Sequence, residues 1–471
     1  MNHYLKYISN IIWLEDFLQY EICRNKPLAK TITIIDKDFK SEYIYDLIYK
    51  TWVQLQKPNI NILNHYIAVH DHQKWGLGKN IYHEAGYFYV QETSAALPAG
   101  LLDIKSWDIV LDVCASPGGK TIQIANILSK IWDGILVSNE FDRNRQQVLT
   151  KNIQKYWLAN IISTGHDTKY ISKNLPETFD HILVDAPCSG EGTCHRDTRF
   201  LKHRSLDLIN KNAKLQFQIL QDMYISLKLG GSMIYSTCTL NPIENEWVVA
   251  KFLAAYSDIN LVDLSRVWLQ PGMLGHWLDI HQTNNLIRLF PHKNQTGGFF
   301  VAKFEKISQK VLLWDDTNIL TEKYTAQIQN FLKYIYNKFG INISQWQFYQ
   351  KDEYIYYYDF GKKNEKAKLL SNQIYKSTLG VIIAKINFKW YILTHTFAKL
   401  FGKFATKSLV KISDIHKIEK LFSDGTLDGD DAQIIGNNII DNQYIYIQSD
   451  NNTNIYLWIG KVLANGLKFN T

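Results

Sequence analysis

The stretch FDHILVDAPCSGEGTCHRD, residues 179–197, decides the fold class of this chain. Its first part, Phe179 to Val184, is apolar and rich in β-forming residues, which is typical of a parallel strand buried on both faces. The strand ends before Pro187, because proline has no amide hydrogen to donate to a neighbouring strand. Asp185 and Cys188 are therefore expected at the carboxyl edge of a sheet, where open α/β sheets bind their ligands.

A second cysteine occupies an equivalent place farther along the chain. Cys238 directly follows the predicted strand 231–237. The carboxyl ends of parallel strands meet at one edge of a sheet, so we expect two thiols and the Asp185 carboxylate to converge there.

Strands and helices alternate regularly around these two strands. Strands are predicted at 108–113, 134–139, 161–165, 179–185 and 231–237, and helices at 121–130, 142–157, 207–228 and 243–256. This alternation predicts an α/β fold with a doubly wound, Rossmann-like parallel sheet. Two further strands, near 286–290 and 299–304, are expected to form an antiparallel edge.

The chain has 471 residues, which is too long for a single hydrophobic core. We predict four units: a small α+β N-terminal appendage (1–85), the Rossmann-like core (86–305), an α+β linker domain (306–395) and a compact all-β C-terminal module (396–471). The appendage combines apolar residues at helical spacing between Leu5 and Leu18 with an alternating strand pattern at 30–35.

The net charge of +7 is concentrated in the last third of the chain. Residues 306–471 hold 21 lysines and no arginine against 15 acidic residues, a surplus of six. Lysine suits diffuse attraction to phosphate groups better than bidentate reading of bases, so nucleic-acid binding is one interpretation. A lysine-rich solvated surface that serves solubility is the other, and composition alone does not separate them.

Cysteine usage and hydropathy indicate a cytoplasmic protein. The five cysteines include no CxxC pair, so reduced thiols are expected, and no group of residues has metal-ligand spacing, so no metal is expected. No apolar run is long enough to span a bilayer, because the best candidate, Gly380 to Leu393, is interrupted by Lys385 and Lys389.

The predicted cofactor site is the loop DVCASPGGKT, residues 112–121, between the first strand and the first helix of the core. A phosphate-binding P-loop would need glycine in place of Cys114, and the dinucleotide pattern GxGxxG is absent. An adenosyl ligand remains, because Glu140 ends the second strand 22 residues after Gly118, where a carboxylate can hold two ribose hydroxyls. Asp167, after the third strand, is placed to meet the adenine.

Two thiols beside an adenosyl ligand fit one reaction. Carbon 5 of a pyrimidine becomes nucleophilic enough to accept a methyl group only after a thiolate has added to carbon 6. A proton donor near ring nitrogen 3 must neutralise the developing charge, and a second thiol can assist release of the first. Cys238, Asp185 and Cys188 would account for these roles. The alternative is that both cysteines are small buried hydrophobes, as most free cysteines are.

Several motifs in this chain resemble those of one family. They are HEAGYFYVQETSA at 83–95, CASPGGKT at 114–121, NE at 139–140, DAPCSGEG at 185–192, STCTLNPIENE at 236–246 and RLFPHKNQTGGFFVAKF at 288–304. Together they resemble the Sun/Fmu family of RNA cytosine-5 methyltransferases, and within it the bacterial 16S ribosomal RNA methyltransferase F type. The segment WIGKVLANGLK at 458–468 is similar to the PUA-like module that closes this type.

The resemblance implies a class I methyltransferase core, a PUA-like RNA-binding domain at 396–471, and roles for named residues. It implies that Cys238 is the nucleophile, that Cys188 promotes product release, and that Asp185 and Lys120 complete the catalytic set. It implies that S-adenosylmethionine contacts Cys114, Ala115, Ser116, Pro117, Gly118, Gly119, Lys120, Glu140, Asp167 and Asp185. The chain departs from the family after GEG, where Cys194-His195-Arg196-Asp197-Thr198 replaces a frequent Arg-Lys-Asp-Pro; Arg196 would be the RNA-facing arginine.

The expected function is S-adenosylmethionine-dependent methylation of carbon 5 of cytosine in RNA, through a covalent cysteine adduct. Small-subunit (16S) ribosomal RNA is the preferred substrate, and transfer RNA is the alternative. A non-catalytic RNA-binding factor in ribosome assembly is the alternative from another class, although a pure binder gains nothing from paired thiols. We expect no DNA and no membrane as partners, and a protein that acts as a monomer.

Overall fold

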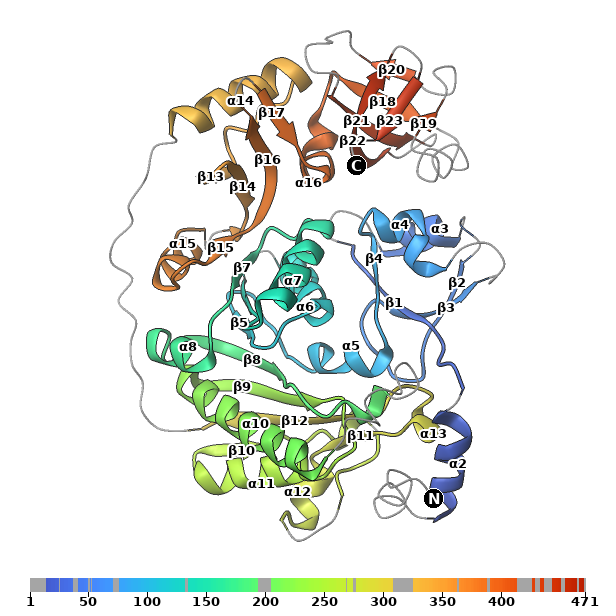
Figure 1. The fold of residues 1–471 in the computed structure, drawn as a ribbon, viewed down its shortest axis with the longest axis vertical. Coiled ribbons are helices and arrows are strands. Elements are labelled where there is room, and N and C mark those ends of the chain that lie inside the picture. The colour runs from blue at the N-terminus through green and yellow to red at the C-terminus, as the bar shows by residue number, and fades with distance from the viewer. Residues whose placement is uncertain are drawn as a thin grey trace.

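The computed structural model describes most of the chain up to residue 412 and five strands beyond it. The described residues are 14–412, apart from 25, 37–40, 50, 52, 71–75, 132–133, 194–204, 268, 274–276, 308–324, 362–363 and 388–389, and then 426–427, 433–435, 443–449, 454–463 and 466–469. Figure 1 shows the N-terminal elements and the C-terminal unit lying against a central α/β core.

The core contains a nine-stranded sheet. Its strands are β5 (Ile109–Asp112), β6 (Ile135–Asn139), β7 (Ile161–Thr164), β8 (Phe179–Asp185), β9 (Leu227–Thr237), β10 (Ile259–Leu261), β11 (Ile287–Leu289), β12 (Phe299–Lys306) and β15 (Thr378–Leu379). The order is β10-β12-β9-β8-β5-β6-β7-β15, with β11 paired to β12. Strands β9, β8, β5, β6 and β7 are parallel, and the outer strands are antiparallel. The predicted Rossmann-like α/β core with an antiparallel edge is confirmed.

Helices cover both faces of this sheet. One face is covered by α5 (Thr93–Gly100), α6 (Gly119–Ile131) and α7 (Arg143–Lys155), and the other by α8 (Thr168–Asn174), α10 (Leu206–Ser226) and α11 (Glu246–Ala255). Successive strand residues alternate between the faces, so Val110 packs in one hydrophobic core while Ile109 and Leu111 pack in the other. Because helices bury both faces of the sheet, these strands are continuous apolar runs.

Three details of the core differ from the sequence prediction. The helix predicted at 207–228 ends at Ser226, because Leu227 already pairs with Phe179 at the start of β9. The short helix α8 was not predicted, and it begins where Asp167 accepts a hydrogen bond from the Tyr170 amide. The short helices α12 (Ile280–Asn284) and α13 (Pro291–Asn294) lie between β10 and β12.

The N-terminal residues form a four-stranded antiparallel sheet in the order β2-β3-β1-β4. Its elements are α2 (Leu14–Arg24), β1 (Thr31–Ile34), α3 (Ser41–Tyr49), β2 (Val53–Gln56), β3 (His65–His70), α4 (Ile81–Glu84) and β4 (Phe88–Val90). The predicted strand at 30–35 is confirmed as β1, and the predicted helix is described from Leu14 onward, so Leu5 lies outside the described residues. Strand β4, just after the predicted boundary at residue 85, pairs with β1.

The C-terminal unit contains two further sheets. The first has the order β13-β14-β16-β17 and the second β19-β23-β22-β21-β18-β20. Their elements are α14 (Ala326–Phe339), β13 (Gln347–Lys351), β14 (Tyr354–Tyr358), α15 (Asn364–Gln373), β16 (Val381–Asn387), β17 (Trp390–Leu393), α16 (His395–Phe401), β18 (Leu409–Ile412), β19 (Thr426–Leu427), β20 (Gln433–Ile435), β21 (Gln443–Ser449), β22 (Asn454–Leu463) and β23 (Gly466–Phe469). The domain boundaries and the PUA-like character of the last unit remain predictions.

This unit is joined to the catalytic core by strand pairing. Strand β15 pairs with β7, with Thr378 opposite Ser163 and Leu379 opposite Ile162, and so completes one edge of the central sheet (Figure 1). Leu379 is buried in the same hydrophobic core as β5 and β8. Truncation after Glu305 would therefore strip a strand from the catalytic sheet as well as remove the C-terminal unit.

Lys399 of α16 forms a second connection to the core. Its ammonium group donates hydrogen bonds to the carbonyl oxygen of Ala85 and, at 3.5 Å, to that of Lys155, the last residue of α7. It also lies 4.7 Å from the ring centroid of Trp157. Burial lowers the pKa of Lys399 to about 7.

This buried lysine predicts a pH-dependent contribution to stability. The pKa of Lys399 is about 7 in the folded protein and 10.5 as an ordinary lysine, so the unfolded chain binds more protons between these pH values. The contribution of Lys399 to the free energy of unfolding should therefore increase between about pH 7.5 and about pH 9.5. Lys399→Met should lack this increase. Lys403→Met, which removes an exposed lysine nearby, is the control. Urea denaturation at both pH values measures this, and identical pH slopes in Lys399→Met and wild type would contradict it.

Among the described residues, no helix combines the length and apolar character needed to cross a membrane.

Candidate active site

The site lies where the order of the sheet changes direction. From β5 the chain continues outward through β6 and β7, and it then returns to build β8 and β9 on the other side of β5. The residues that follow β5, β8 and β9 therefore meet at one edge, at the topological switch point where such sheets bind ligands. This edge carries the loop after Asp112, the end of β8 at Asp185, and Cys238 directly after β9.

The two predicted cysteines are in contact. The Sγ atoms of Cys188 and Cys238 lie 3.3 Å apart, and both cysteines are free thiols. The hydrogen bond to Cys238, together with burial, holds the pKa of Cys188 well above its usual range. The backbone amide of Gly192 donates to the Cys238 carbonyl oxygen at 2.8 Å. A Cβ on Gly192 would collide with the carbonyl oxygen of Gly298, so only glycine permits this close approach.

Asp185 and Lys120 form an ion pair beside the thiols. Lys120, in the first turn of α6, places Nζ 2.6 Å from Oδ2 of Asp185, and Ser236 donates to Oδ1 at 2.9 Å. Lys120 is almost buried, with Nζ 5.4 Å from the ring centroid of Phe299. Both oxygens of Asp185 therefore accept a hydrogen bond from a neighbouring side chain. The structure thus brings all four predicted catalytic residues to one sheet edge.

The predicted cofactor loop joins β5 to α6. It contains a cis peptide bond between Ser116 and Pro117, and Gly118 has a φ of 112°, a conformation that favours glycine. Asn139 holds this loop through its backbone carbonyl, which accepts from the Ala115 amide at 2.9 Å, and its side chain, which donates to Val113. The first turn of α6 presents backbone amides at the end of the loop, a site suited to a polar ligand.

Glu140 and Asp167 follow the next two strands. Glu140 is buried, and its carboxylate accepts hydrogen bonds from the amides of Ser116 at 3.2 Å and Asp142 at 3.1 Å. It therefore fixes the cofactor loop relative to α7. Asp167 is exposed and caps α8 by accepting from the Tyr170 amide at 2.7 Å. Burial and the nearby carboxylates raise the pKa of the Cys114 thiol, so Cys114 is neutral in this loop.

Asp112 is a buried acid that the sequence analysis did not single out. Its Oδ2 accepts a hydrogen bond from Thr121 at 2.6 Å. Burial raises the pKa of Asp112 to about 7. The sequence signal that could have identified Asp112 is its position at the end of β5, the strand that pairs with β8, which ends at Asp185.

Arg288 and Glu246 form a buried ion pair behind the cysteine loops. The guanidinium binds the carboxylate with two hydrogen bonds, Nε to Oε1 at 2.7 Å and NH2 to Oε2 at 2.6 Å. NH1 donates to the carbonyl oxygen of Leu240, two residues after Cys238, at 3.0 Å. Both side chains are 2% exposed or less. Both residues lie inside motifs that resemble those of the family, but their spacing in the sequence carries no signal that they pair.

Replacing Arg288 should destabilise the fold strongly. Arg288→Met would leave the Glu246 carboxylate buried without its counter-charge, and breaking such a pair costs about 3–5 kcal/mol. Arg266, whose guanidinium is 72% exposed and 4.0 Å from Asp103, is the matched control. Arg266→Met should change the free energy of unfolding by less than about 1 kcal/mol. Equal losses in the two variants, measured by urea denaturation, would be incompatible with a structural role for the buried pair.

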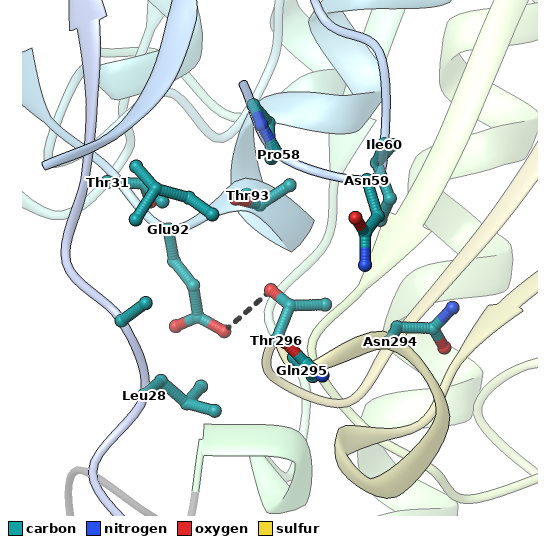
Figure 2. Close-up of a pocket in the computed structure, with 12 residues that line it drawn as sticks. Leu28, Thr31, Pro58, Asn59, Ile60, Glu92, Thr93, Asn294, Gln295 and Thr296 are labelled. Atoms are coloured by element: carbon teal, nitrogen blue, oxygen red, sulfur yellow. Dashed lines mark hydrogen bonds between the residues drawn. The ribbon is translucent and has the colours of Figure 1, made fainter. Parts of the chain in front are cut away.

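A separate pocket lies between the N-terminal sheet and the α13–β12 turn. Its volume is about 70 Å³, and its lining includes Thr31, Asn59, Glu92, Thr93 and Thr296. Figure 2 shows Glu92 reaching across to Thr296, whose hydroxyl donates to Oε1 at 3.4 Å. The lining contains no cysteine and none of the predicted cofactor residues, so this pocket is distinct from the thiol site.

Some predicted features fall outside what the structure describes. The segment Cys194-His195-Arg196-Asp197-Thr198 lies outside the described residues. Within the described part of the chain, no group of three or more His, Cys, Asp and Glu side chains could hold a metal ion.

Comparison with known proteins establishes the family. The family described as 16S rRNA methyltransferase RsmB/F matches residues 99–305. The ribosomal RNA small subunit methyltransferase F of Aeromonas salmonicida is 32% identical over 353 residues, which cover 73% of this chain and 71% of that protein. This chain belongs to the RsmB/F family. The protein of the same name from Vibrio cholerae is 33% identical over 287 residues, covering 60% of this chain and 59% of that protein. The predicted family and the predicted methyltransferase activity are confirmed.

Solved structures support the RsmB/F assignment at the level of the fold. A methyltransferase homologue from Pyrococcus horikoshii is 29% identical, with a TM-score of 0.56 over 63% of this chain and 92% of that chain. NSun6 from the same organism, solved with SFG, has a TM-score of 0.55 at 22% identity, covering 65% of this chain and 98% of that chain.

Proposed function

We propose that this RsmB/F-family methyltransferase transfers a methyl group from S-adenosylmethionine to carbon 5 of a cytosine in small-subunit ribosomal RNA. The observation that carries the proposal is the contact of two free thiols, Cys188 and Cys238, at the sheet edge that also holds the Lys120–Asp185 pair. A pure RNA-binding protein would have no use for paired thiols beside a proton donor.

The first step is addition of the Cys238 sulfur to carbon 6 of the cytosine. We assign the attacking sulfur to Cys238 because its motif, STCTLNPIENE at 236–246, resembles the family motif that implies this role. Electron density moves toward ring nitrogen 3 as the new bond forms. Asp185 relays a proton from Lys120 to that nitrogen, and the same pair takes this proton back after carbon 5 has accepted the methyl group. Ser236 keeps the Asp185 carboxyl oriented toward the base.

Release of the product needs a base for the proton on carbon 5. Once Cys238 is bonded to carbon 6, it no longer shares a hydrogen bond with Cys188, whose own proton passes to water. The Cys188 thiolate then takes the carbon 5 proton. The electrons of that C–H bond restore the double bond between carbons 5 and 6, and Cys238 leaves as a thiolate. The net result is one methyl group gained and one proton released to water.

The residues at the edge of the sheet fit S-adenosylmethionine. When bound, this cofactor supplies the methyl group. Glu140 and Asp167 lie at the ends of successive strands, where carboxylates suit ribose hydroxyls and the adenine amino group, and Asp185 offers negative charge toward a sulfonium. A side chain at Gly118 would press against Leu149 of α7, so glycine keeps the loop close to that helix. Cys114, Ala115, Ser116, Pro117, Gly119 and Lys120 complete the proposed contact surface.

Two curated relatives, both named ribosomal RNA small subunit methyltransferase F, support RNA of the small subunit as the substrate. The lysine surplus in residues 306–471 supports RNA contact by the C-terminal unit, because lysines attract phosphate groups. Lys399 should be excluded from that surface, since it is buried against the catalytic core. Transfer RNA remains the alternative substrate.

Bisulfite sequencing of total RNA tests the proposal. RNA from a strain that lacks the protein should lose one or more 5-methylcytosines in 16S rRNA relative to the parent strain. Re-expression of wild-type protein should restore them, and re-expression of Cys238→Ala should not. Loss of 5-methylcytosine from transfer RNA alone would identify transfer RNA as the substrate. Unchanged methylation in every RNA would refute the proposed function.

A further inference from the structure

Glu244 lies in the buried layer beneath the two cysteine loops. It is fully buried and belongs to the same motif as Cys238. Its Oε2 accepts two hydrogen bonds, from the backbone amide of Ser189 at 3.0 Å and from Nε2 of Gln216 at 3.0 Å. Burial raises the pKa of Glu244, and hydrogen bonds from its neighbours partly oppose this rise.

Gln216 extends this network to the other side of Cys188. It is buried on α10, and Nε2 also donates to the carbonyl oxygen of Pro187 at 2.9 Å. Glu244 and Gln216 therefore hold the backbone of the residue before Cys188 and that of the residue after it. Ser189 adds a hydroxyl contact of 2.9 Å to Thr239, the residue after Cys238.

Cys238 is held by different contacts. It follows β9, which pairs with β8 and β12, and its carbonyl oxygen accepts from the Gly192 amide. None of these contacts involves Glu244 or Gln216. A change at Glu244 should therefore displace Cys188, whose two neighbouring residues this network holds directly, more than Cys238.

We infer that Glu244, together with Gln216, is a positioning residue that sets Cys188 for the release step rather than for thiolate addition. This inference rests on the proposed function, because it assigns Cys188 to proton removal from carbon 5. A misplaced Cys188 takes that proton slowly, so the bond between the Cys238 sulfur and carbon 6 persists. The methylated adduct should then accumulate, although methyl transfer itself has occurred.

The test compares two variants with a matched control. Glu244→Gln keeps the size of the side chain but replaces the carboxylate with a neutral amide oxygen, which weakens both hydrogen bonds, and Gln216→Met removes both donors at once. Gln218→Met is the control, because Gln218 lies on the same helix and also donates to a carboxylate, that of Asp222 at 3.0 Å. Each protein is incubated with S-adenosylmethionine and a 16S rRNA fragment. Released 5-methylcytosine and the covalent protein–RNA band on denaturing gels are then measured.

We expect Glu244→Gln and Gln216→Met to form the adduct at close to the wild-type rate and to turn over about tenfold to a hundredfold more slowly. Gln218→Met should behave like wild type. The inference is overturned if both network variants turn over like Gln218→Met, or if adduct formation falls as much as turnover. If Glu244→Gln does not fold, Gln216→Met alone decides between these results. Failure of the wild-type protein to methylate any RNA would instead count against the proposed function.

Discussion

Replacing Cys238 with alanine should abolish methylation. Without its sulfur nothing adds to carbon 6, and carbon 5 never becomes nucleophilic enough to accept the methyl group. The loss should be at least about 10³-fold, as for other catalytic nucleophiles. Methyl transfer from radiolabelled S-adenosylmethionine to a 16S rRNA fragment measures it, and binding of the cofactor should be retained because Cys238 is not in the proposed cofactor loop.

Cys23→Ala is the matched control for this change. Cys23 is also a free thiol, and it lies in α2 of the N-terminal region rather than at the edge of the central sheet. Its replacement should leave methyl transfer within about twofold of wild type, since a substitution away from the site changes little. Substantial activity in Cys238→Ala would remove the basis of the covalent route.

Replacing Cys188 with alanine should produce a different defect. Addition and methyl transfer should proceed, but proton removal from carbon 5 loses its base, so turnover should fall by about 10²-fold or more. A protein–RNA adduct that survives denaturing electrophoresis should accumulate. Combining both replacements in one protein should eliminate the adduct, because the double variant lacks the Cys238 sulfur that bonds to carbon 6.

The variant in which the covalent adduct accumulates shows which cysteine is the nucleophile. Their 3.3 Å separation means that geometry alone permits either sulfur to attack. The assignment rests on the motifs around the two cysteines, which resemble family motifs that imply these roles. An adduct that accumulated in Cys238→Ala and was missing in Cys188→Ala would exchange the two roles.

Much of the core could be predicted because its strands are buried on both faces. The strand predicted at 179–185 matches β8 at both ends, since an apolar run followed by proline leaves little choice. The pairing of β15 with β7 could not be predicted. It joins Thr378 to Ser163 across more than 200 residues, and a two-residue strand carries no periodic signal.

The site shows the same division between local and distant information. Cys188, Cys238 and Asp185 could be brought together from the sequence because each lies at a strand end. The supporting residues could not, because their partners are set by packing. Gln216 has the composition of an ordinary helical polar residue, and only the fold buries it against Pro187. Glu244 lay within a recognised motif, yet nothing in the spacing connected it to Ser189.

The most direct test of the central claim is to identify the atom of the protein that bonds to the base. Wild-type protein and S-adenosylmethionine are mixed with a 16S rRNA fragment that carries 5-fluorocytidine, whose fluorine cannot leave as a cation, so the adduct is trapped after methyl transfer. Protease digestion and mass spectrometry then locate the modified nucleotide. The account predicts that it is attached to the peptide that contains Cys238. Attachment to the peptide that contains Cys188, or methylation of ordinary cytosine with no trapped adduct, would contradict it.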